Sequence, residues 1–109
     1  MKKIPNPFGK KGYKPHQNKI SEQGQRIFSE GLTPDFEYRL EFPDGSVNYV
    51  DVAAIDTLGN EAEFVQVGVQ TKKGNPVARE QRIIDKIKRF FQIPVTFVPY
   101  KTLGDKDNL

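Results

Sequence analysis

Apolar residues recur at two different spacings along the chain, and these spacings predict its helices and strands. A helical spacing over residues 15–30, with Pro15 at the first position, predicts one helix. A second helical stretch runs to about residue 91 and begins at Asn75-Pro76, where an N-cap side chain precedes a proline. One side of this second helix is apolar, so we expect it to pack against a core.

Four further stretches have the pattern of β-strands. Residues 36–42 alternate apolar and polar positions, 47–55 and 62–70 are mostly apolar, and 95–98 form a short last strand. Three strands in sequence predict a meander, and the last strand, reached through a helix, can pair in parallel. The sequence therefore predicts an α/β fold in the order helix, three strands, helix, strand, with a mixed central sheet flanked by helices.

Composition limits the classes of site that the chain can carry. The 109 residues include no cysteine and one histidine, His16, which excludes disulfides, thiolate catalysis and multi-histidine metal sites. No apolar run is long enough to cross a membrane, and no signal-peptide pattern follows the N-terminal lysines. We therefore expect no membrane partner and action in a reducing, cytoplasmic environment.

The positive charge is concentrated at the N-terminus. The net charge is +3, yet residues 1–19 hold six lysines and no acid, and the remaining residues have a net charge of −3. Such an arm suits phosphate backbones or an acidic protein partner, although a solvated leader is the plain alternative. We expect a basic flexible arm over 1–14, one domain over 15–100 and a polar tail over 101–109.

The second and third predicted strands place polar side chains opposite each other. By strand parity, Asp51 points to one face of its strand, and Val50 and Val52 point to the other. If residues 57–60 form a four-residue turn, Asp51 lies across from Gln66.

Gly68 and Gln70 share the face of Gln66, so a polar patch is expected on a largely apolar sheet. Burying such groups without partners costs about 1–3 kcal/mol each, so the patch needs an explanation. One interpretation is a metal site, because hard cations take carboxylate and amide oxygens. The other is a structural pair between Asp51 and Arg39 or a backbone amide.

The second predicted helix carries a basic stripe beside its apolar side, a pattern typical of proteins that follow a phosphate backbone. A solvated helix flank is the alternative. The stripe consists of Arg79, Arg82, Lys86 and Arg89. Glu80 falls inside the apolar side and in the first turn, where the helix dipole favours its charge. It either simply caps the helix or points at the polar patch. Further candidates for binding nucleic acid are Lys10, Lys11, Lys14 and Lys72.

The element order, with an acid in the middle of the second strand, resembles the restriction-endonuclease-like nuclease superfamily. It is most similar to the compact Holliday-junction-resolvase type. Residues 9–100 also resemble nuclease-type toxin domains found at the C-termini of bacterial polymorphic toxins. The runs that carry the resemblance are Lys11-Gly12-Tyr13-Lys14-Pro15-His16-Gln17, Tyr49-Val50-Asp51-Val52-Ala53, Gln66-Val67-Gly68 and Pro76-Val77-Ala78-Arg79-Glu80.

The resemblance implies a nuclease that cleaves phosphodiester bonds of DNA or RNA with Mg²⁺ or Mn²⁺. Asp51 and Gln66 would hold the metal, with Glu80 nearby, and His16 or Gln17 would position the metal or the attacking water. It also implies a cognate immunity or inhibitor protein as a partner, and it allows a homodimer.

Two other functions stay open. Gln66 and Gly68 stand where the superfamily has an acid and a lysine, which favours a module that binds nucleic acid without cutting it. The acidic body favours a protein-interaction domain.

Overall fold

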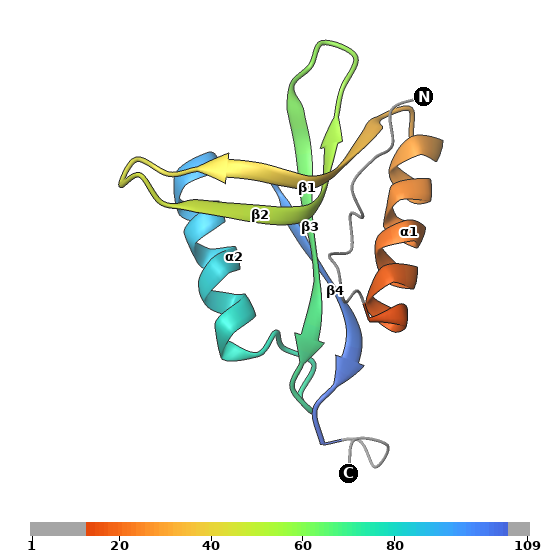
Figure 1. The fold of residues 1–109 in the computed structure, drawn as a ribbon, viewed down its shortest axis with the longest axis vertical. Helices are drawn as coiled ribbons and strands as arrows, with labels where there is room; N and C mark the ends of the chain where they lie inside the picture. The colour runs from red at the N-terminus through yellow and green to blue at the C-terminus, as the bar shows by residue number, and fades with distance from the viewer. Residues whose placement is uncertain (1–12, 105–109) are drawn as a thin grey trace.

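A computed structural model describes residues 13–104 and shows an α/β fold in which a mixed sheet lies between two helices (Figure 1). The elements are α1 (Lys14–Ser29), β1 (Thr33–Glu41), β2 (Val47–Ile55), β3 (Glu61–Gln70), α2 (Ala78–Phe91) and β4 (Val95–Thr102). The predicted fold class and element order are confirmed.

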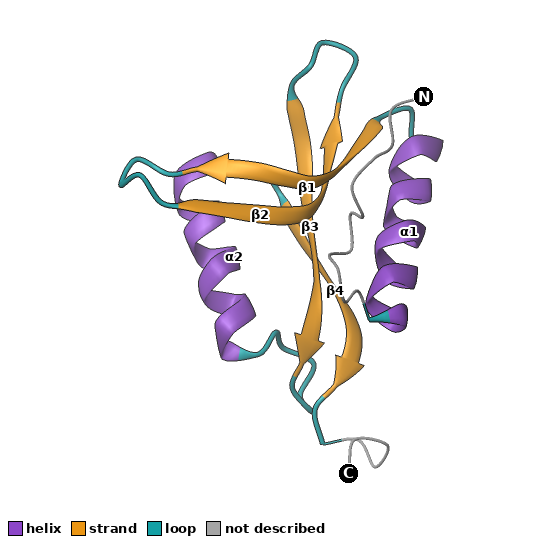
Figure 2. Ribbon diagram, in the orientation of Figure 1, coloured by secondary structure: helices purple, strands orange, loops and turns teal. Residues whose placement is uncertain are grey.

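The sheet has the strand order β1-β2-β3-β4. The first three strands form an antiparallel meander, and β4 pairs with β3 in parallel after the chain has passed through α2. The predicted meander and parallel crossover are therefore confirmed. Figure 2 shows that the β1–β2 hairpin turns away from β3 and β4 and crosses beside α2.

Each helix covers its own hydrophobic cluster on one side of the sheet (Figure 1). The cluster under α1 is built from Ile20, Ile27, Val52, Ala54, Val65 and Val67. The cluster under α2 is built from Leu40, Phe42, Val50, Ala53, Phe64 and Ile87. The two clusters explain the nearly continuous apolar run of β3, because its residues face a core on either side.

The regular alternation of β2 breaks at Asp51. Val52 packs in the α1 cluster, but Val50, two residues earlier, packs in the α2 cluster. The prediction that Val50 and Val52 share a face is therefore wrong. Across from Asp51 on β1, Glu37 has a left-handed backbone with φ of 50°, and the strand twists there.

The bounds of three elements differ from the prediction by more than one residue, because strand pairing sets them. Strand β1 begins at Thr33 rather than at residue 36, because Thr33, Pro34 and Asp35 pair with β2. Helix α2 begins at Ala78 rather than at Asn75-Pro76, because the segment before it pairs with the edge of β3. Strand β4 continues to Thr102, well past residue 98, because its parallel pairing with β3 supplies backbone partners along that whole length.

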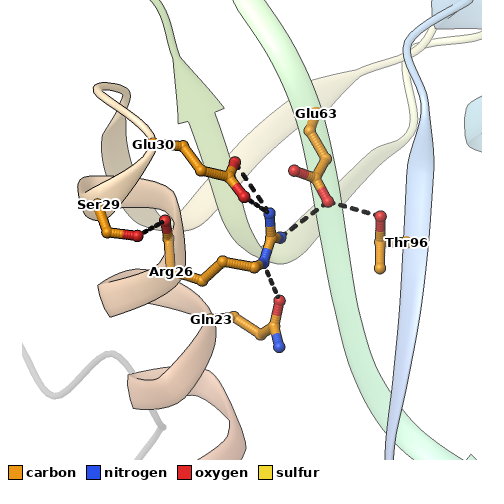
Figure 3. Close-up of polar contacts among 6 residues, drawn as sticks. All are labelled: Gln23, Arg26, Ser29, Glu30, Glu63 and Thr96. Carbon is orange, nitrogen blue, oxygen red and sulfur yellow. Dashed lines mark hydrogen bonds and ion pairs between the residues drawn. The ribbon is translucent and has the colours of Figure 1, made fainter.

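A polar cluster joins α1 to the sheet near the end of the helix (Figure 3). Arg26 donates to Glu63 Oε2 of β3 at 2.9 Å and to both carboxylate oxygens of Glu30. Thr96 of β4 donates to the same Glu63 oxygen at 2.5 Å. The guanidinium therefore links the helix to β3, and Glu63 extends the link to β4.

Candidate functional site

The site begins where the ladder between β2 and β3 opens. Their register pairs Val52 with Val65 and Ala53 with Phe64, and the next step would set Asp51 against Gln66, the expected register. At that step, backbone N–H groups donate to side chains instead of to the backbone of the neighbouring strand. Asp51 N–H donates to Gln66 Oε1 at 3.0 Å. Val67 N–H donates to Asp51 Oδ2 at 2.7 Å, so neither strand leaves this step without polar partners.

His16 closes the same opening from the first turn of α1. Its Nε2 lies 3.1 Å from the carbonyl oxygen of Val67 and 3.8 Å from Asp51 Oδ1. Because a carbonyl can only accept, Nε2 carries the hydrogen, and in the neutral ring Nδ1 is the basic nitrogen. The side chains of His16 and Asp51 each keep 22% of their surface exposed, so solvent reaches both.

Glu80 reaches the site from the first turn of α2. The residue is only 8% exposed, and its carboxylate lies against Gly68 of β3. A Cβ at position 68 would stand 2.5 Å from Glu80 Oε2, so the glycine makes the approach possible. Of the two interpretations open from sequence, the structure therefore has Glu80 pointing at the polar patch.

The loop before α2 fixes where Glu80 lies. Val77 N–H donates to the carbonyl of Val69 at 3.0 Å, and Pro76 forms a bridge with Gln70. This pairing lies along the part of β3 that no longer pairs with β2. The start of α2 is therefore held beside Gly68.

The two carboxyl groups share an unfavourable electrostatic environment. Burial raises the pKa of Asp51, and the charge of Glu37 raises it further, whereas the Val67 N–H and His16 lower it. Burial likewise raises the pKa of Glu80, which Arg79 and His16 lower and the charge of Asp51 raises. A nearby cation would relieve this repulsion, as it does in many catalytic carboxylate pairs.

An aromatic group borders the site on the β4 side. The Tyr100 ring meets the edge of His16 at 5.1 Å between centroids, and Tyr13 meets Tyr100 at 5.7 Å. Burial raises the pKa of Tyr100, and the charge of Glu80 raises it further. Tyr100 was not among the predicted site residues, because the predicted last strand ended at residue 98. The parallel pairing that extends β4 has no local sequence signal.

The remaining predicted residues fall in different places. Gln17 lies in the same helical turn as His16, and its backbone N–H donates to the carbonyl of Tyr13. Lys14 is exposed at the start of α1, and the Lys72 side chain packs against Gly104. Lys10 and Lys11 lie outside the described residues.

The basic residues of the α2 stripe differ in their exposure and in what they contact. Lys86 donates to Ser46 at 2.6 Å and lies 4.3 Å from the centre of the Phe42 ring, so it holds the β1–β2 turn. Arg82 and Arg89 are exposed and line an open groove of about 530 Å³ with Asp44, Asp85 and Phe90. Arg79 is 74% exposed and lies 3.8 Å from Glu80 Oε2, closest to the site.

Within residues 13–104, no group of three or more histidine or acidic side chains is arranged to hold a metal ion. The candidate donors are the carboxylates of Asp51 and Glu80. Mg²⁺ is commonly bound through one or two carboxylates together with substrate phosphates. The donor set therefore fits Mg²⁺ that arrives with a phosphate, and it does not fit a preformed cage.

Comparison of the chain with family models, curated proteins and solved structures found no match. In the described part of the chain, neither helix is long and apolar enough to span a membrane.

Proposed function

We propose that the protein is a Mg²⁺-dependent nuclease that hydrolyses phosphodiester bonds at the opening between β2 and β3. The observation that carries the proposal is the pair of desolvated carboxylates, Asp51 and Glu80, beside His16. Burial is the main cause that raises both pKa values, and the charge of Asp51 raises that of Glu80 further. Carboxylates in such surroundings are typical of sites that bind cations or transfer protons.

Asp51 and Glu80 would hold the metal, which would supply Lewis-acid stabilisation of the charge that develops on the phosphate. Asp51 Oδ1 is the oxygen suited to this, because Oδ2 is committed to the Val67 N–H. Gln66 becomes a positioning residue, since its Oε1 fixes the Asp51 backbone.

His16 would position the attacking water rather than take its proton. Its Nε2–H donates to the Val67 carbonyl and lies 3.8 Å from Asp51 Oδ1, so the lone pair of Nδ1 points away from that oxygen. Arg79, which is exposed beside Glu80, and Lys14, which is exposed at the start of α1, would bind the neighbouring phosphates.

A second candidate function is nucleic-acid binding without cleavage. Its support is that Asp51, Gln66 and His16 each bond a backbone group of the opened ladder, which is a sufficient structural reason for all three. Here the arginines of α2 and the lysine arm would bind phosphate, and no bond would break.

The test uses purified protein with plasmid DNA, single-stranded DNA and RNA, each with Mg²⁺, Mn²⁺ or EDTA. The variant Asp51→Asn removes the charge and keeps an oxygen that can accept the Val67 N–H, so we expect it to fold. Glu22→Gln is the control, because Glu22 is an exposed acid that pairs with Lys19. Metal-dependent cutting that only Asp51→Asn abolishes supports the nuclease. Salt-sensitive binding with no cutting supports the second candidate.

A further inference from the structure

We propose that the site takes single-stranded nucleic acid and that Tyr13 stacks on an unpaired base beside the phosphate that is cut. This inference rests on the proposed nuclease function, because it names the substrate of the same site. It comes from three aromatic rings that lead from the surface to the two carboxylates.

The outermost ring is Tyr13, which is 53% exposed at the start of α1. Its neighbour is Tyr100 of β4, at 5.7 Å between centroids and an interplanar angle of 60°. Tyr100 in turn meets His16 edge-on at 5.1 Å and 83°. Tyr100 therefore supports the exposed ring from behind and joins it to the site.

Tyr100 also lies within electrostatic reach of Glu80, whose charge raises the pKa of the tyrosine. The three rings therefore extend from the surface to His16, and Tyr100 lies near Glu80. His16 and Glu80 are two of the groups on which the nuclease proposal depends. A base on Tyr13 would place its own backbone phosphate toward these groups. Exposed cations are available there from Lys14, the next residue of α1, and from Arg79 beside Glu80.

The Tyr13 side chain does not cap its helix. Tyr13 is the N-cap residue of α1, but its side chain makes no capping hydrogen bond. An exposed tyrosine with no such role beside a charged site is suited to stacking, which contributes about five- to hundredfold in affinity per base.

Stacking selects unpaired nucleotides. In a duplex both faces of each base are covered by neighbouring bases, so a side chain at the surface cannot stack on them without unstacking the helix. In a single strand the faces are open, and stacking accepts any base. We therefore expect single-stranded DNA and RNA to bind better than duplexes, without strong base preference.

The test measures binding by fluorescence anisotropy in the Asp51→Asn background, with Mg²⁺, for labelled single-stranded DNA, single-stranded RNA and duplex DNA of one sequence. We expect the single strands to bind at least about tenfold more tightly than the duplex. Tyr13→Ala should weaken single-strand binding about tenfold and leave the duplex unchanged, while Tyr13→Phe should stay within about twofold. Phe28→Ala is the control, because Phe28 is a 74% exposed aromatic at the far end of the same helix.

Equal binding of duplex and single strands, or a Tyr13→Ala protein that binds like its parent, would overturn the inference. Cleavage by the wild-type protein is scored separately. If the wild type cuts nothing but binds single strands through Tyr13, the nuclease proposal fails and the stacking site stands. If the wild type cuts and Tyr13→Ala has no effect on binding, the nuclease stands and the stacking site fails.

Discussion

At the scale of single residues, the site keeps acidic groups where their charges are unfavourable. Glu80 is buried against Gly68, and Asp51 lies between two strands that have separated. Carboxylates whose burial outweighs the help of their neighbours weaken a fold when they ionise, so such groups are typical of function rather than of stability.

Neutralising Glu80 should therefore stabilise the protein near neutral pH. The folded state raises the pKa of Glu80, so it binds the proton more tightly than the unfolded state, and stability is lost as pH rises through that pKa. Glu80→Gln cannot ionise and should be more stable than the wild type at about pH 7. The difference should vanish below the ordinary glutamate pKa of 4.5. Urea unfolding at both pH values measures this, and a destabilised Glu80→Gln at neutral pH would contradict it.

At the scale of elements, local sequence patterns predicted whether each segment is a helix or a strand. Where several of these elements begin or end is decided by pairing between strands. The predicted and observed bounds of α1 and of the middle strands differ by one residue or none, because their apolar spacing is strong. The predicted start of α2 and end of β4 were wrong, because both depend on contacts with β3. The predicted start of β1 was three residues late, because its first residues pair with β2. The face of Val50 was wrong because β2 twists at Asp51.

The left-handed backbone of Glu37, which lies across from Asp51, has a testable cost in stability. A left-handed backbone costs a residue with a Cβ about 1–2 kcal/mol, and glycine avoids that cost while losing about 0.5–1 kcal/mol through chain entropy. We expect Glu37→Gly to leave the free energy of unfolding unchanged or to raise it by up to about 1.5 kcal/mol. Glu41→Gly, at an exposed position of the same strand with no positive φ, should lower it by about 0.5–1 kcal/mol. Chemical denaturation compares the two, and an equal loss in both would contradict a strained backbone at Glu37.

At the scale of the whole molecule, each helix is fixed through its contacts with the sheet. The cluster around Arg26 therefore has a structural role, because it holds α1, and with it His16, against β3 and β4 (Figure 3).

Removing the guanidinium should weaken the fold measurably. Arg26→Ala leaves Glu63, whose side chain is 16% exposed, without its charged donor. We expect a loss of about 1.5–3 kcal/mol in the free energy of unfolding, the usual value for hydrogen bonds to charged groups. Lys19→Ala breaks only an exposed pair with Glu22 and should cost less than about 1 kcal/mol. Thermal and urea unfolding test this, and equal losses in the two variants would contradict the structural role.

Part of the candidate site could be predicted from sequence. Strand parity and a turn length were enough to set Asp51 near Gln66, and helical geometry offered Glu80 as a member of the patch. The contact of His16 with the opened ladder, the third acid Glu37 and the Tyr100 ring were not predictable in this way. They depend on a strand separation and a long parallel strand that only tertiary packing produces.

The most direct test of the account is the cleavage rate of a fluorescent single-stranded oligonucleotide by the wild type and by Asp51→Asn, with Mg²⁺ and with EDTA. A Mg²⁺-dependent nuclease should cleave the oligonucleotide with Mg²⁺ and not with EDTA. Asp51→Asn should lose at least about a hundredfold in rate, while its unfolding curve stays close to that of the wild type. Cleavage that persists in Asp51→Asn or in EDTA, or no cleavage of any substrate by the wild type, would contradict the proposed function.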